Sequence, residues 1–391
     1  MNIVYLGAFR LPNFDAAAAR VINIARALRE SGHSVRFISW GGQLQSEDKI
    51  GTGYYVDGFP YEVTNELPHP GMSFPEKLRN RLYQGKKTKH LLRACPEPMD
   101  VIITYNNCLC RWLIPFCEKR GIKLINDITE WYDFNELKPT DWPGYAFDMY
   151  CVQKRVKNKI VISSYLDRFY HSTNNIVVPA TCDAAETKWH QVSDIAKLNV
   201  GEYDGLTLIY AGNPARKDAV HYMINAVNAL ANEGAKIRFL IIGITQEQYV
   251  ERYKDLLKEK ELNDSIKFLG RVSQDEVPSY YSLSDFMVLL RESNRKSNAG
   301  FPTKFSESFT SGTPVIANIT SDLGSYLKDG ETGFVVPEPS EEAFYQIIKK
   351  QVLPLGKDSI NGMKNNVKRS AKQLDYHAFV EPLKVFIENL I

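Results

Sequence analysis

Two charged side chains near the start of one short predicted helix could bind an anionic ligand, and they are Lys304 and Glu307. Pro302 suits a first helical position and Gly312 is a stop signal, so a helix is predicted over residues 302–311. A helix N-terminus offers unpaired N–H groups and a positive dipole end to a phosphate, and Lys304 adds a full charge there. Glu307 follows on the same face, about 4.5 Å along the axis, where its carboxylate could accept hydrogen bonds from ribose hydroxyls. The alternative is a solvated ion pair between the two side chains on an ordinary amphipathic helix.

A glycine turn followed by two adjacent cations opens the second half of the chain. Gly212 follows a predicted strand over residues 206–210, and Arg216 and Lys217 precede an amphipathic helical pattern. Ligands of open α/β sheets bind beyond the carboxyl ends of the strands, so both cations are candidates for binding substrate phosphates. The alternative is that they are solvated loop cations. Neither half carries G-x-G-x-x-G after its first strand and no G-x-x-x-x-G-K-[ST] occurs, which disfavours a dinucleotide oxidoreductase and a P-loop enzyme.

Length and composition are those of a globular protein of two domains. The chain has 391 residues, more than one hydrophobic core usually serves, and its net charge of +2 does not suggest binding to nucleic acid. Six cysteines form no C-x-x-C pair and the seven histidines show no ligand spacing, so neither a disulfide framework nor a metal site is predicted. The N-terminus lacks a signal-peptide pattern and no apolar run reaches the ~18 residues that cross a bilayer. We therefore expect a cytoplasmic protein.

Short apolar runs alternate with helical patterns along the chain, which predicts an α/β protein with parallel sheets covered by helices. The strands are predicted at 3–6, 35–39, 101–105, 123–126, 160–162 and 176–178 in the first half, and at 206–210, 237–242, 266–269, 286–290, 315–317 and 334–336 in the second. We therefore predict two Rossmann-like domains that face a central cleft, the usual place for a small-molecule site. The predicted domains are 1–185 and 186–375, and a last helix over 376–391 is expected to pack back on the first domain.

The first half carries candidate binding residues of its own, near the ends of two of its predicted strands. Its first strand and the helix that follows contribute Gly7, Arg10 and Asp15. Asp127, Glu130 and Trp131 follow a later strand and join carboxylates to an aromatic ring, a combination that is common at sugar-binding surfaces. The alternative for this second group is that Asp127 caps a helix and Glu130 closes a capping box.

The run from Gly300 to Ala317 carries the most specific motif of the chain. It reads G-x-P-x-K-x-x-E followed by G-x-P-V-I-A, and it resembles the motif of the large fourth family of retaining GT-B glycosyltransferases. That family includes many bacterial capsule, O-antigen and exopolysaccharide sugar transferases. Supporting similarities lie at residues 31–35, 177–183, 210–217, 268–272 and 329–334. The resemblance covers nearly the whole chain and implies the GT-B fold.

The resemblance also implies roles for individual residues. The first domain would supply the acceptor side, for which Gly7, Arg10, Asp15 and Trp131 are the candidates. Lys217, Arg216 and Lys304 would bind the donor diphosphate, Glu307 would hold the ribose, and the backbone at Arg271 and Val272 would meet the nucleobase. Further donor-side positions are Gly212, Arg291, Asn298, Gly300, Phe301, Pro302 and Thr303, and the candidates for acting in catalysis are Lys217, Lys304, Asp127 and Glu130.

The sequence departs from the family pattern at two positions. Many members have a second glutamate near the donor sugar where this chain has Ala299, so Asn298, Gly300 or Phe301 would contact the sugar instead. An arginine that often follows the glycine of the turn is Asn213 here, and Arg216 or Arg291 could replace its charge. For Arg291 the alternative is a local ion pair with Glu292.

The activity implied is transfer of a sugar from a nucleotide-diphosphate donor to a saccharide or polyprenyl-linked saccharide, with retention at the anomeric carbon. Lysines, arginines and a helix N-terminus can stabilise the leaving diphosphate without a metal ion, and no cofactor is expected. Two alternatives remain open, a GT-B nucleotide-sugar epimerase and a catalytically silent nucleotide-sugar-binding partner, which Ala299 would support. The basic amphipathic segment Leu78–Arg93 suits an anionic membrane surface, although it could equally be a solvated helix.

Overall fold

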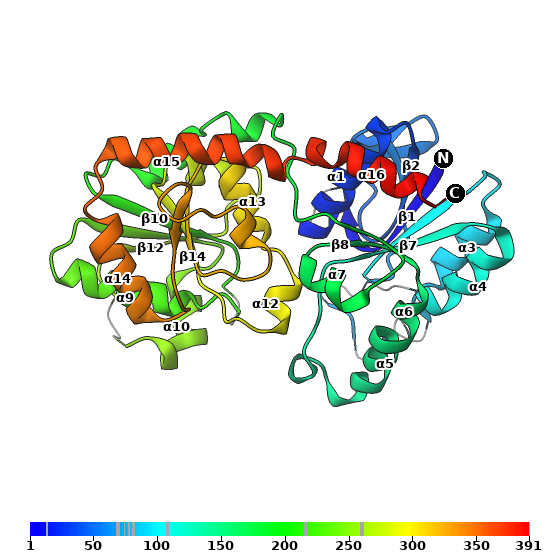
Figure 1. Ribbon diagram of the computed structural model, residues 1–391, viewed down its shortest axis with the longest axis horizontal. Coiled ribbons are helices and arrows are strands. Elements are labelled where there is room, and N and C mark those ends of the chain that lie inside the picture. Colours follow the sequence, from blue (N-terminus) through cyan, green and yellow to red (C-terminus); the bar gives the residue numbers. More distant parts are fainter. Residues whose placement is uncertain are drawn as a thin grey trace. The chain divides into compact units, whose positions relative to one another are not determined.

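The computed structural model describes residues 1–12, 15–67, 71–73, 75–76, 79, 83–106, 109–214, 217–258 and 262–390, apart from the side chains of residues 136 and 140. The chain divides into two compact units (Figure 1). The first comprises Met1–Thr181 and Tyr376–Ile391, and the second comprises Cys182–Asp375. The sequence places the first boundary a few residues later, after residue 185, and the second at the same point, after residue 375.

A nine-stranded sheet forms the centre of the first unit, in the order β3-β4-β5-β2-β1-β6-β7-β8-β9. The strands from β5 to β9 in this order run parallel, and β3 and β4 extend the β5 edge as antiparallel strands. The bounds are β1 (Asn2–Leu11), β2 (Ser34–Gly42), β3 (Lys49–Ile50), β4 (Gly53–Val56), β5 (Phe59–Val63), β6 (Val101–Tyr105), β7 (Lys123–Ile128), β8 (Asn158–Val161) and β9 (Asn174–Val177). The six strands predicted in the first half are all present.

Three strands at the edge of this sheet, β3, β4 and β5, are not predicted by the sequence. Both residues of β3 are exposed, and no residue of β4 is fully buried. Because a continuous apolar run is the signal of a strand buried on both faces, an exposed antiparallel edge gives no such signal. The third missed strand, β5, pairs parallel with β2, but its buried residues Phe59 and Tyr61 alternate with exposed ones, so it has no continuous apolar run either.

The helices of the first unit cover this sheet, and α1 is the one that the sequence defines most clearly. Asp15 caps α1 by accepting the Ala18 N–H at 2.8 Å, as expected for the residue that opens this helix. The helices described are α1 (Ala16–Glu30), α3 (Lys86–Ala94), α4 (Cys110–Arg120), α5 (Trp142–Phe147), α6 (Gln153–Arg155), α7 (Ser164–Tyr170) and α16 (Val380–Glu388). Shorter helical turns are η1 (Ser46–Asp48), η2 (Phe134–Glu136), η3 (Pro139–Asp141), η4 (Asp148–Val152) and η10 (Tyr376–Phe379).

The last helix, α16, belongs to the first unit although it follows the second in the chain. It contacts α1, beside which Figure 1 draws it in red. Leu383 and Phe386 of α16 are buried in the same hydrophobic cluster as Leu28 of α1 and Tyr5 of β1. Burial of this apolar face holds the chain end against the first sheet.

A six-stranded, fully parallel sheet forms the centre of the second unit, in the order β12-β11-β10-β13-β14-β15. The bounds are β10 (Leu206–Ala211), β11 (Ile237–Ile242), β12 (Ile266–Gly270), β13 (Phe286–Leu289), β14 (Val315–Ala317) and β15 (Gly333–Val335). Each of the six predicted strands is present, with ends that differ by no more than one residue from the prediction. The apolar runs of β10, β13 and β14 are buried on both faces, as parallel strands between helices require, whereas only Ile266 is buried in the edge strand β12.

Helices cover this second sheet as well. They are α8 (Asp194–Val200), α9 (Val220–Asn232), α10 (Gln246–Tyr253), α11 (Val277–Ser282), α12 (Arg295–Ala299), α13 (Thr303–Thr310), α14 (Glu341–Ile347) and α15 (Lys357–Ser370). Shorter turns are η5 (Thr187–Trp189), η6 (Lys254–Leu256), η7 (Leu323–Ser325), η8 (Ile348–Val352) and η9 (Ala371–Leu374). The helix predicted over residues 302–311 is α13. Pro302 occupies its N-cap in an extended conformation and not its first helical position, which corrects the prediction by one residue.

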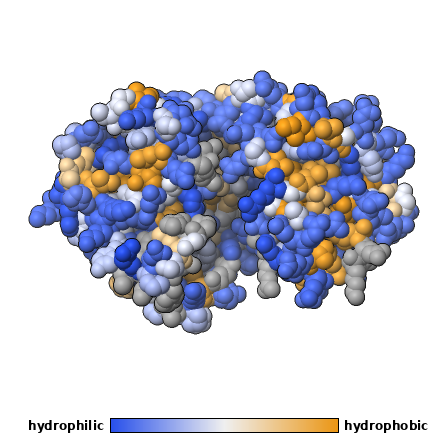
Figure 2. All heavy atoms as spheres, turned by 180° about the vertical axis from the view of Figure 1, so that it is seen from behind, coloured by the Kyte–Doolittle hydropathy of each residue, from blue (hydrophilic) through white to orange (hydrophobic). Residues whose placement is uncertain are grey.

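Hydrophilic residues cover most of the face seen in Figure 2, with apolar patches among them. In the part of the chain that the structure describes, no helix is both long enough and apolar enough to cross a bilayer.

Candidate functional site

A buried carboxylate, that of Asp218, is the centre of a charged cluster just beyond the carboxyl end of β10. Its exposed fraction is 1 %, and its partners come from three other parts of the second unit. Lys304 Nζ lies 2.5 Å from Oδ2, Arg291 Nε lies 2.7 Å from Oδ1, and the Tyr210 hydroxyl donates to Oδ2 at 2.7 Å. Burial alone would raise the pKa of Asp218, but the two cations outweigh it and hold this pKa well below its usual range.

The cluster carries more positive than negative charge, because two buried cations share one carboxylate. Burial lowers the pKa of Lys304, Asp218 opposes this change, and the charges of Arg291 and Lys217 lower the pKa further. Lys217 therefore lies close enough to act on the same site. Gly212 also borders it, since a Cβ built there would lie 3.2 Å from Lys304 Nζ. An anion bound at this point would neutralise the excess charge.

Glu307 is half-buried on α13, one helical turn beyond Lys304. Within the described part of the chain its carboxylate makes no hydrogen bond, and burial raises its pKa while the charge of Lys304 lowers it. The alternative of a solvated Lys304–Glu307 ion pair is wrong, because Lys304 is paired with Asp218. Glu307 thus offers a hydrogen-bond acceptor beside a cluster of excess positive charge.

Arg291 has a partner that the sequence does not suggest. Its side chain is buried against Asp218, and its backbone N–H donates to Asn318 Oδ1 at 2.8 Å. The alternative of a local ion pair with Glu292 is therefore wrong. Arg291 adds a positive charge to the cluster, and its side chain is buried. Its replacement of the missing arginine in donor binding stays a prediction.

The segment that joins α12 to α13 holds several of the predicted sugar contacts, and their side chains are largely occupied. Phe301 is buried, with its ring 6.0 Å from that of Phe305 and 5.7 Å from that of Tyr326. A sugar contact through the Phe301 ring is therefore contradicted, because the ring packs in the core. Asn298 accepts from the Ser321 N–H at 3.0 Å and donates to Ser293 Oγ at 3.3 Å, so it fixes the local loops.

The other residues of this segment can contact a ligand mainly through their backbone atoms. Ala299 is fully buried in α12, so a longer side chain at this position would not fit without rearrangement. Pro302 is buried, whereas Gly300 and Thr303 are half-buried. Gly300 and Thr303 remain predicted donor contacts.

The residues predicted to contact the nucleobase directly follow β12, which is separated from β10 by β11. Arg271 is exposed and Val272 half-buried directly after this strand. The ends of β10, β11 and β12 are joined there, because Gly212 N–H donates to the Ile242 carbonyl at 3.0 Å and Gly243 N–H donates to the Gly270 carbonyl at 2.6 Å. Both residues therefore lie at the same sheet edge as the charged cluster, and their contact with a base stays a prediction. Arg216 lies outside the described residues.

In the first unit, Asp127 is not available as a catalytic group. Its carboxylate is fully buried at the end of β7, where Arg20 Nη2 lies 2.8 Å from Oδ1 and the Tyr5 hydroxyl donates to Oδ2 at 2.5 Å. Arg20 also donates to the carbonyl oxygens of Val178 and Pro179, so the pair joins distant parts of the unit. The capping alternative is wrong as well, because Asp127 lies inside β7 and residues 129–133, directly after this strand, are not helical.

Trp131 and Glu130 lie in different environments. Trp131 is buried, and its ring centroid lies 3.9 Å from that of Phe169, so it packs in the core and cannot stack on a sugar. The exposed carboxylate of Glu130 accepts a hydrogen bond from the Tyr132 hydroxyl. Glu130 stays a candidate, whereas Trp131 does not.

The remaining acceptor-side candidates have local structural roles. A Cβ at Gly7 would lie 2.9 Å from Tyr105 in β6, so this glycine permits close packing of two strands. Asp15 caps α1, and Arg10 Nη1 lies 3.0 Å from its carboxylate. Arg10 remains exposed enough to contact a ligand, whereas both oxygens of Asp15 have partners.

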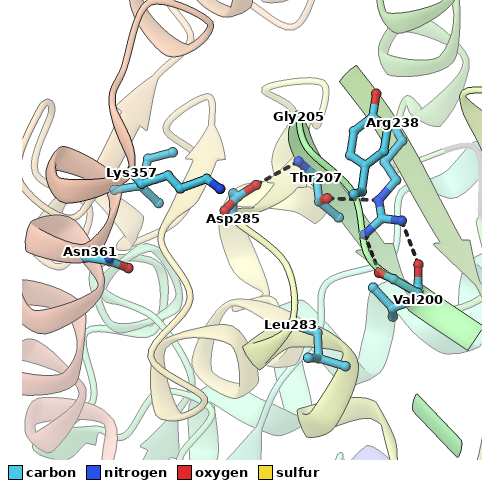
Figure 3. A pocket seen from close by; sticks show the side chains of 11 residues that line it. Val200, Gly205, Thr207, Arg238, Leu283, Asp285, Lys357 and Asn361 are labelled. Atoms are coloured by element: carbon cyan, nitrogen blue, oxygen red, sulfur yellow. Dashed lines mark hydrogen bonds between the residues drawn. The ribbon is translucent and has the colours of Figure 1, made fainter. Parts of the chain in front are cut away.

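A cavity of about 250 Å³ lies at the opposite, amino edge of the second sheet and not at the charged cluster. Figure 3 shows that its polar side chains point toward one another: Arg238 donates to Thr207 and to the Val200 carbonyl, and Asp285 accepts from the Thr207 N–H. Because the walls satisfy most of their own polar groups, we assign no ligand to this cavity. Among the described residues no group of histidine, cysteine and carboxylate side chains could hold a metal ion.

Comparison with solved structures defines the class of fold. The sucrose-phosphate synthase of Thermosynechococcus elongatus matches with a TM-score of 0.76 and 14 % identity, covering 100 % of this chain and 98 % of that one. Anabaena HepE, in complex with UDP and glucose, matches with a TM-score of 0.71 and 14 % identity, covering 100 % of each chain. The chain has the GT-B glycosyltransferase fold, as predicted from the sequence.

Comparison of sequences identifies the domain. Residues 197–368, within the second unit, match the family of Glycosyl transferases group 1. An uncharacterized glycosyltransferase of Haemophilus influenzae is 21 % identical over 338 residues, which are 82 % of each chain. The putative colanic acid biosynthesis glycosyltransferase WcaL of Escherichia coli is 24 % identical over 142 residues, which are 36 % of this chain and 34 % of that one. The second unit is therefore a group 1 glycosyltransferase domain, and the glycosyltransferase resemblance is confirmed.

Proposed function

We propose that this protein is a retaining glycosyltransferase of surface polysaccharide synthesis. It moves a sugar from a nucleotide-diphosphate donor to a saccharide or lipid-linked saccharide. The observation that carries this proposal is the excess positive charge around Asp218 beside the carboxylate of Glu307, which makes no hydrogen bond to the residues that the structure describes. The UDP bound in the HepE structure and the colanic acid role in the name of WcaL support the donor class and the acceptor class.

The charged cluster suits the departure of a diphosphate. In the reaction, the bond from the anomeric carbon to the diphosphate oxygen breaks and a bond to the acceptor oxygen forms, so negative charge grows on the leaving group. Lys304 and Lys217 stabilise that charge, and no metal ion is needed for it. Asp218 does not touch the substrate in this account. It is a positioning residue, because it holds Lys304 through a contact of 2.5 Å.

The neighbouring residues bind the rest of the donor. Glu307 accepts hydrogen bonds from the ribose hydroxyls, and the backbone near Arg271 and Val272 borders the base. Gly300 and Thr303 contribute backbone near the transferred sugar, where Ala299 provides no carboxylate. The donor sugar is thus held mainly by main-chain groups and by substrate hydroxyls that contact them.

The same donor site would serve an epimerase or a silent binding partner, so the test must separate binding from turnover. A thermal-shift screen against UDP-, GDP- and dTDP-sugars identifies the donor, since a ligand at ~100 Kd adds about 2.7 kcal/mol of stability. The selected donor is then incubated alone and with a mixture of bacterial surface oligosaccharides. Transfer to an oligosaccharide supports the proposal. Quantitative isomerisation of the donor alone identifies an epimerase, and binding without any turnover identifies a silent partner.

The proposal includes work at the cytoplasmic face of a membrane, where a lipid-linked acceptor would be presented. The observation in its favour is the basic helix α3, which exposes Lys86 and Arg93 while Thr88 and Leu92 are buried. Of the basic segment predicted from Leu78 to Arg93, the residues Leu78, Asn80, Arg81 and Leu82 lie outside the described part. Attraction of these cations to anionic lipid adds ~1 kcal/mol per residue near the surface.

A further inference from the structure

A cluster of aromatic rings is exposed on the first unit, in the segment that follows β7. Tyr132, Phe134 and Trp142 have exposed fractions of 39, 36 and 41 %, and Tyr145 is half-buried beneath them. We call these four residues the aromatic platform. Apolar side chains that gather in one exposed place, and are not scattered singly, indicate a binding surface.

The rings of the aromatic platform contact one another edge to face. Centroid distances are 6.2 Å from Tyr132 to Tyr145, 5.9 Å from Phe134 to Trp142 and 6.3 Å from Phe134 to Tyr145. Hydrogen bonds fix the same residues, because Trp142 Nε1 donates to the Phe134 carbonyl at 2.7 Å and the Tyr132 N–H donates to the Tyr145 hydroxyl at 2.7 Å. The platform is therefore preorganised, and a ligand would not need to order it.

The helix that supports the platform is attached to the body of the unit. Arg111 of α4 donates to Asp148 Oδ1 at 2.9 Å and to the Gly144 carbonyl at 3.4 Å, and its guanidinium lies 4.6 Å from the Phe147 ring centroid. Trp131, at the other end of the segment, is anchored in the core on Phe169. Rigid elements thus hold the platform at both ends.

The charge of this segment decides which occupant fits. Residues 130–150 contain five acidic side chains, Glu130, Asp133, Glu136, Asp141 and Asp148, and one basic side chain, Lys138. Arg111 neutralises Asp148, and the four remaining carboxylates still outnumber the single Lys138. This excess of negative charge disfavours anionic lipid headgroups and acidic glycans. The apolar C–H face of a pyranose can stack on aromatic rings, while carboxylates accept hydrogen bonds from its hydroxyls. A neutral saccharide therefore fits both the rings and the charge.

We propose that the aromatic platform binds a neutral pyranose unit of the acceptor, an inference that rests on the proposed glycosyltransferase function. The platform adds Tyr132, Phe134, Trp142 and Tyr145 to the acceptor side, in place of the buried Trp131. These residues determine which acceptors are used and take no part in bond making. Neutral glycans are selected over glycans that carry uronic acids.

The test compares binding to an array of bacterial surface oligosaccharides, some neutral and some containing uronic acids. The proteins are wild type, a Phe134→Ser/Trp142→Gln variant, a Tyr132→Ser variant and a matched control, Tyr83→Ser, which removes a 56 % exposed ring outside the platform in the same unit. Melting temperatures establish that each variant folds, and the single substitution Tyr132→Ser keeps the test valid if the double variant does not. Wild type and Tyr83→Ser should bind neutral glycans, and each platform variant should bind them about tenfold more weakly or worse.

Two further measurements separate the possible failures. Equal binding of wild type and both platform variants, no glycan binding by wild type, or equal binding of acidic and neutral glycans overturns the inference. Loss of binding to phosphatidylcholine vesicles in the platform variants, with no loss on the array, overturns it in favour of a lipid surface. Nucleotide-sugar binding is measured for all four proteins by thermal shift. If wild type binds no nucleotide sugar, the proposed function itself fails, whereas donor binding without platform-dependent glycan binding removes only this inference.

Discussion

Lys304 is paired with Asp218 and not with Glu307, which lies one turn further along its own helix. The ammonium is 2.5 Å from the Asp218 carboxylate, which also accepts from Arg291. This pairing has two consequences. It holds the Lys304 charge at the end of β10, and it leaves the Glu307 carboxylate available to a ligand.

Removal of the Glu307 carboxylate should weaken donor binding without unfolding the protein. In Glu307→Gln, the loss of charge-assisted hydrogen bonds to the ribose should cost roughly 1.5 to 3 kcal/mol of binding free energy. Calorimetric titration with the donor found in the screen measures this change. The control is Glu331→Gln, at an exposed glutamate of the same unit. Unchanged affinity in a folded Glu307→Gln protein would remove Glu307 from the site.

Donor binding should also weaken on acidification. Burial raises the pKa of Glu307 above the ordinary glutamate value, and the proton competes with the ribose because only the carboxylate accepts both hydrogen bonds. The Kd of wild type should therefore rise as pH falls below neutrality, at pH values still above the ordinary glutamate pKa of about 4.3. Glu307→Gln, which carries no titrating group at this position, should give a flatter profile. Parallel profiles for the two proteins would show that another group controls binding.

Asp218 should contribute to stability through the same cluster. In Asp218→Asn two buried cations lose their counter-charge, and breaking such a buried pair costs about 3 to 5 kcal/mol. Because the folded pKa of Asp218 is lowered, its contribution is complete above the ordinary aspartate pKa of about 3.9 and is lost as pH falls through the lower folded value. In urea at pH 7, the free energy of unfolding of Asp218→Asn should be clearly lower than that of wild type. Below about pH 4 this difference should become smaller.

The control for this comparison is Asp204→Asn, at an exposed carboxylate paired with Lys236 on the surface. Screening by solvent makes such a pair weak, so its loss should change the stability little. Equal stabilities of Asp218→Asn and wild type at pH 7 would contradict the role assigned to the cluster.

The sequence predicts every parallel strand of the two units except β5, because the apolar runs of the others indicate burial directly. It also places Gly212, Lys304 and Glu307 at one sheet edge, since the order of strand and helix fixes their position. Other outcomes depend on partners far away in the chain. Asp127 is neutralised by Arg20, 107 positions earlier, and Lys304 is held by Asp218, 86 positions earlier.

No local pattern contains such partners. The Asp-Ile-Thr-Glu-Trp-Tyr segment predicts a sugar-binding surface, which stays a prediction, and the ring assigned to that surface, Trp131, is buried. Trp131 meets Phe169 in the core, and the exposed rings follow it in the chain. Asp218 could have been considered from its position, since it directly follows Lys217 at a strand end.

Loss of either site lysine should slow turnover more than it weakens donor binding. The charge on the diphosphate grows as it departs, so Lys217→Ala and Lys304→Ala should lower kcat by about 100-fold or more with smaller changes in KM. Lys350→Ala, at an exposed lysine of η8, is the matched control. Wild-type activity should persist in EDTA. Strict dependence on added magnesium or manganese would overturn the metal-free mechanism.

Attachment to anionic membranes should depend on the basic surface of α3 and on salt. Lys86 lies 5.1 Å from the Tyr83 ring, and Lys89 and Arg93 lie 5.5 and 5.3 Å from the Trp112 ring, so cations and aromatic rings share one surface. Lys87 is left unchanged in the test, because its ammonium donates to the Thr64 carbonyl at 2.8 Å. The variant is Lys86→Gln/Lys89→Gln/Arg93→Gln.

Co-sedimentation with phosphatidylglycerol vesicles at two salt concentrations measures the effect. Wild type should bind at low salt and be released at high salt, because screening shortens the reach of the cations, and the variant should bind weakly at both. The control is Lys254→Gln/Lys350→Gln/Lys372→Gln, which removes three exposed cations of the second unit and should behave as wild type. Equal binding by all three proteins, or binding by none, would identify α3 as an ordinary solvated helix and would leave a soluble saccharide as well supported as a lipid-linked one as the acceptor.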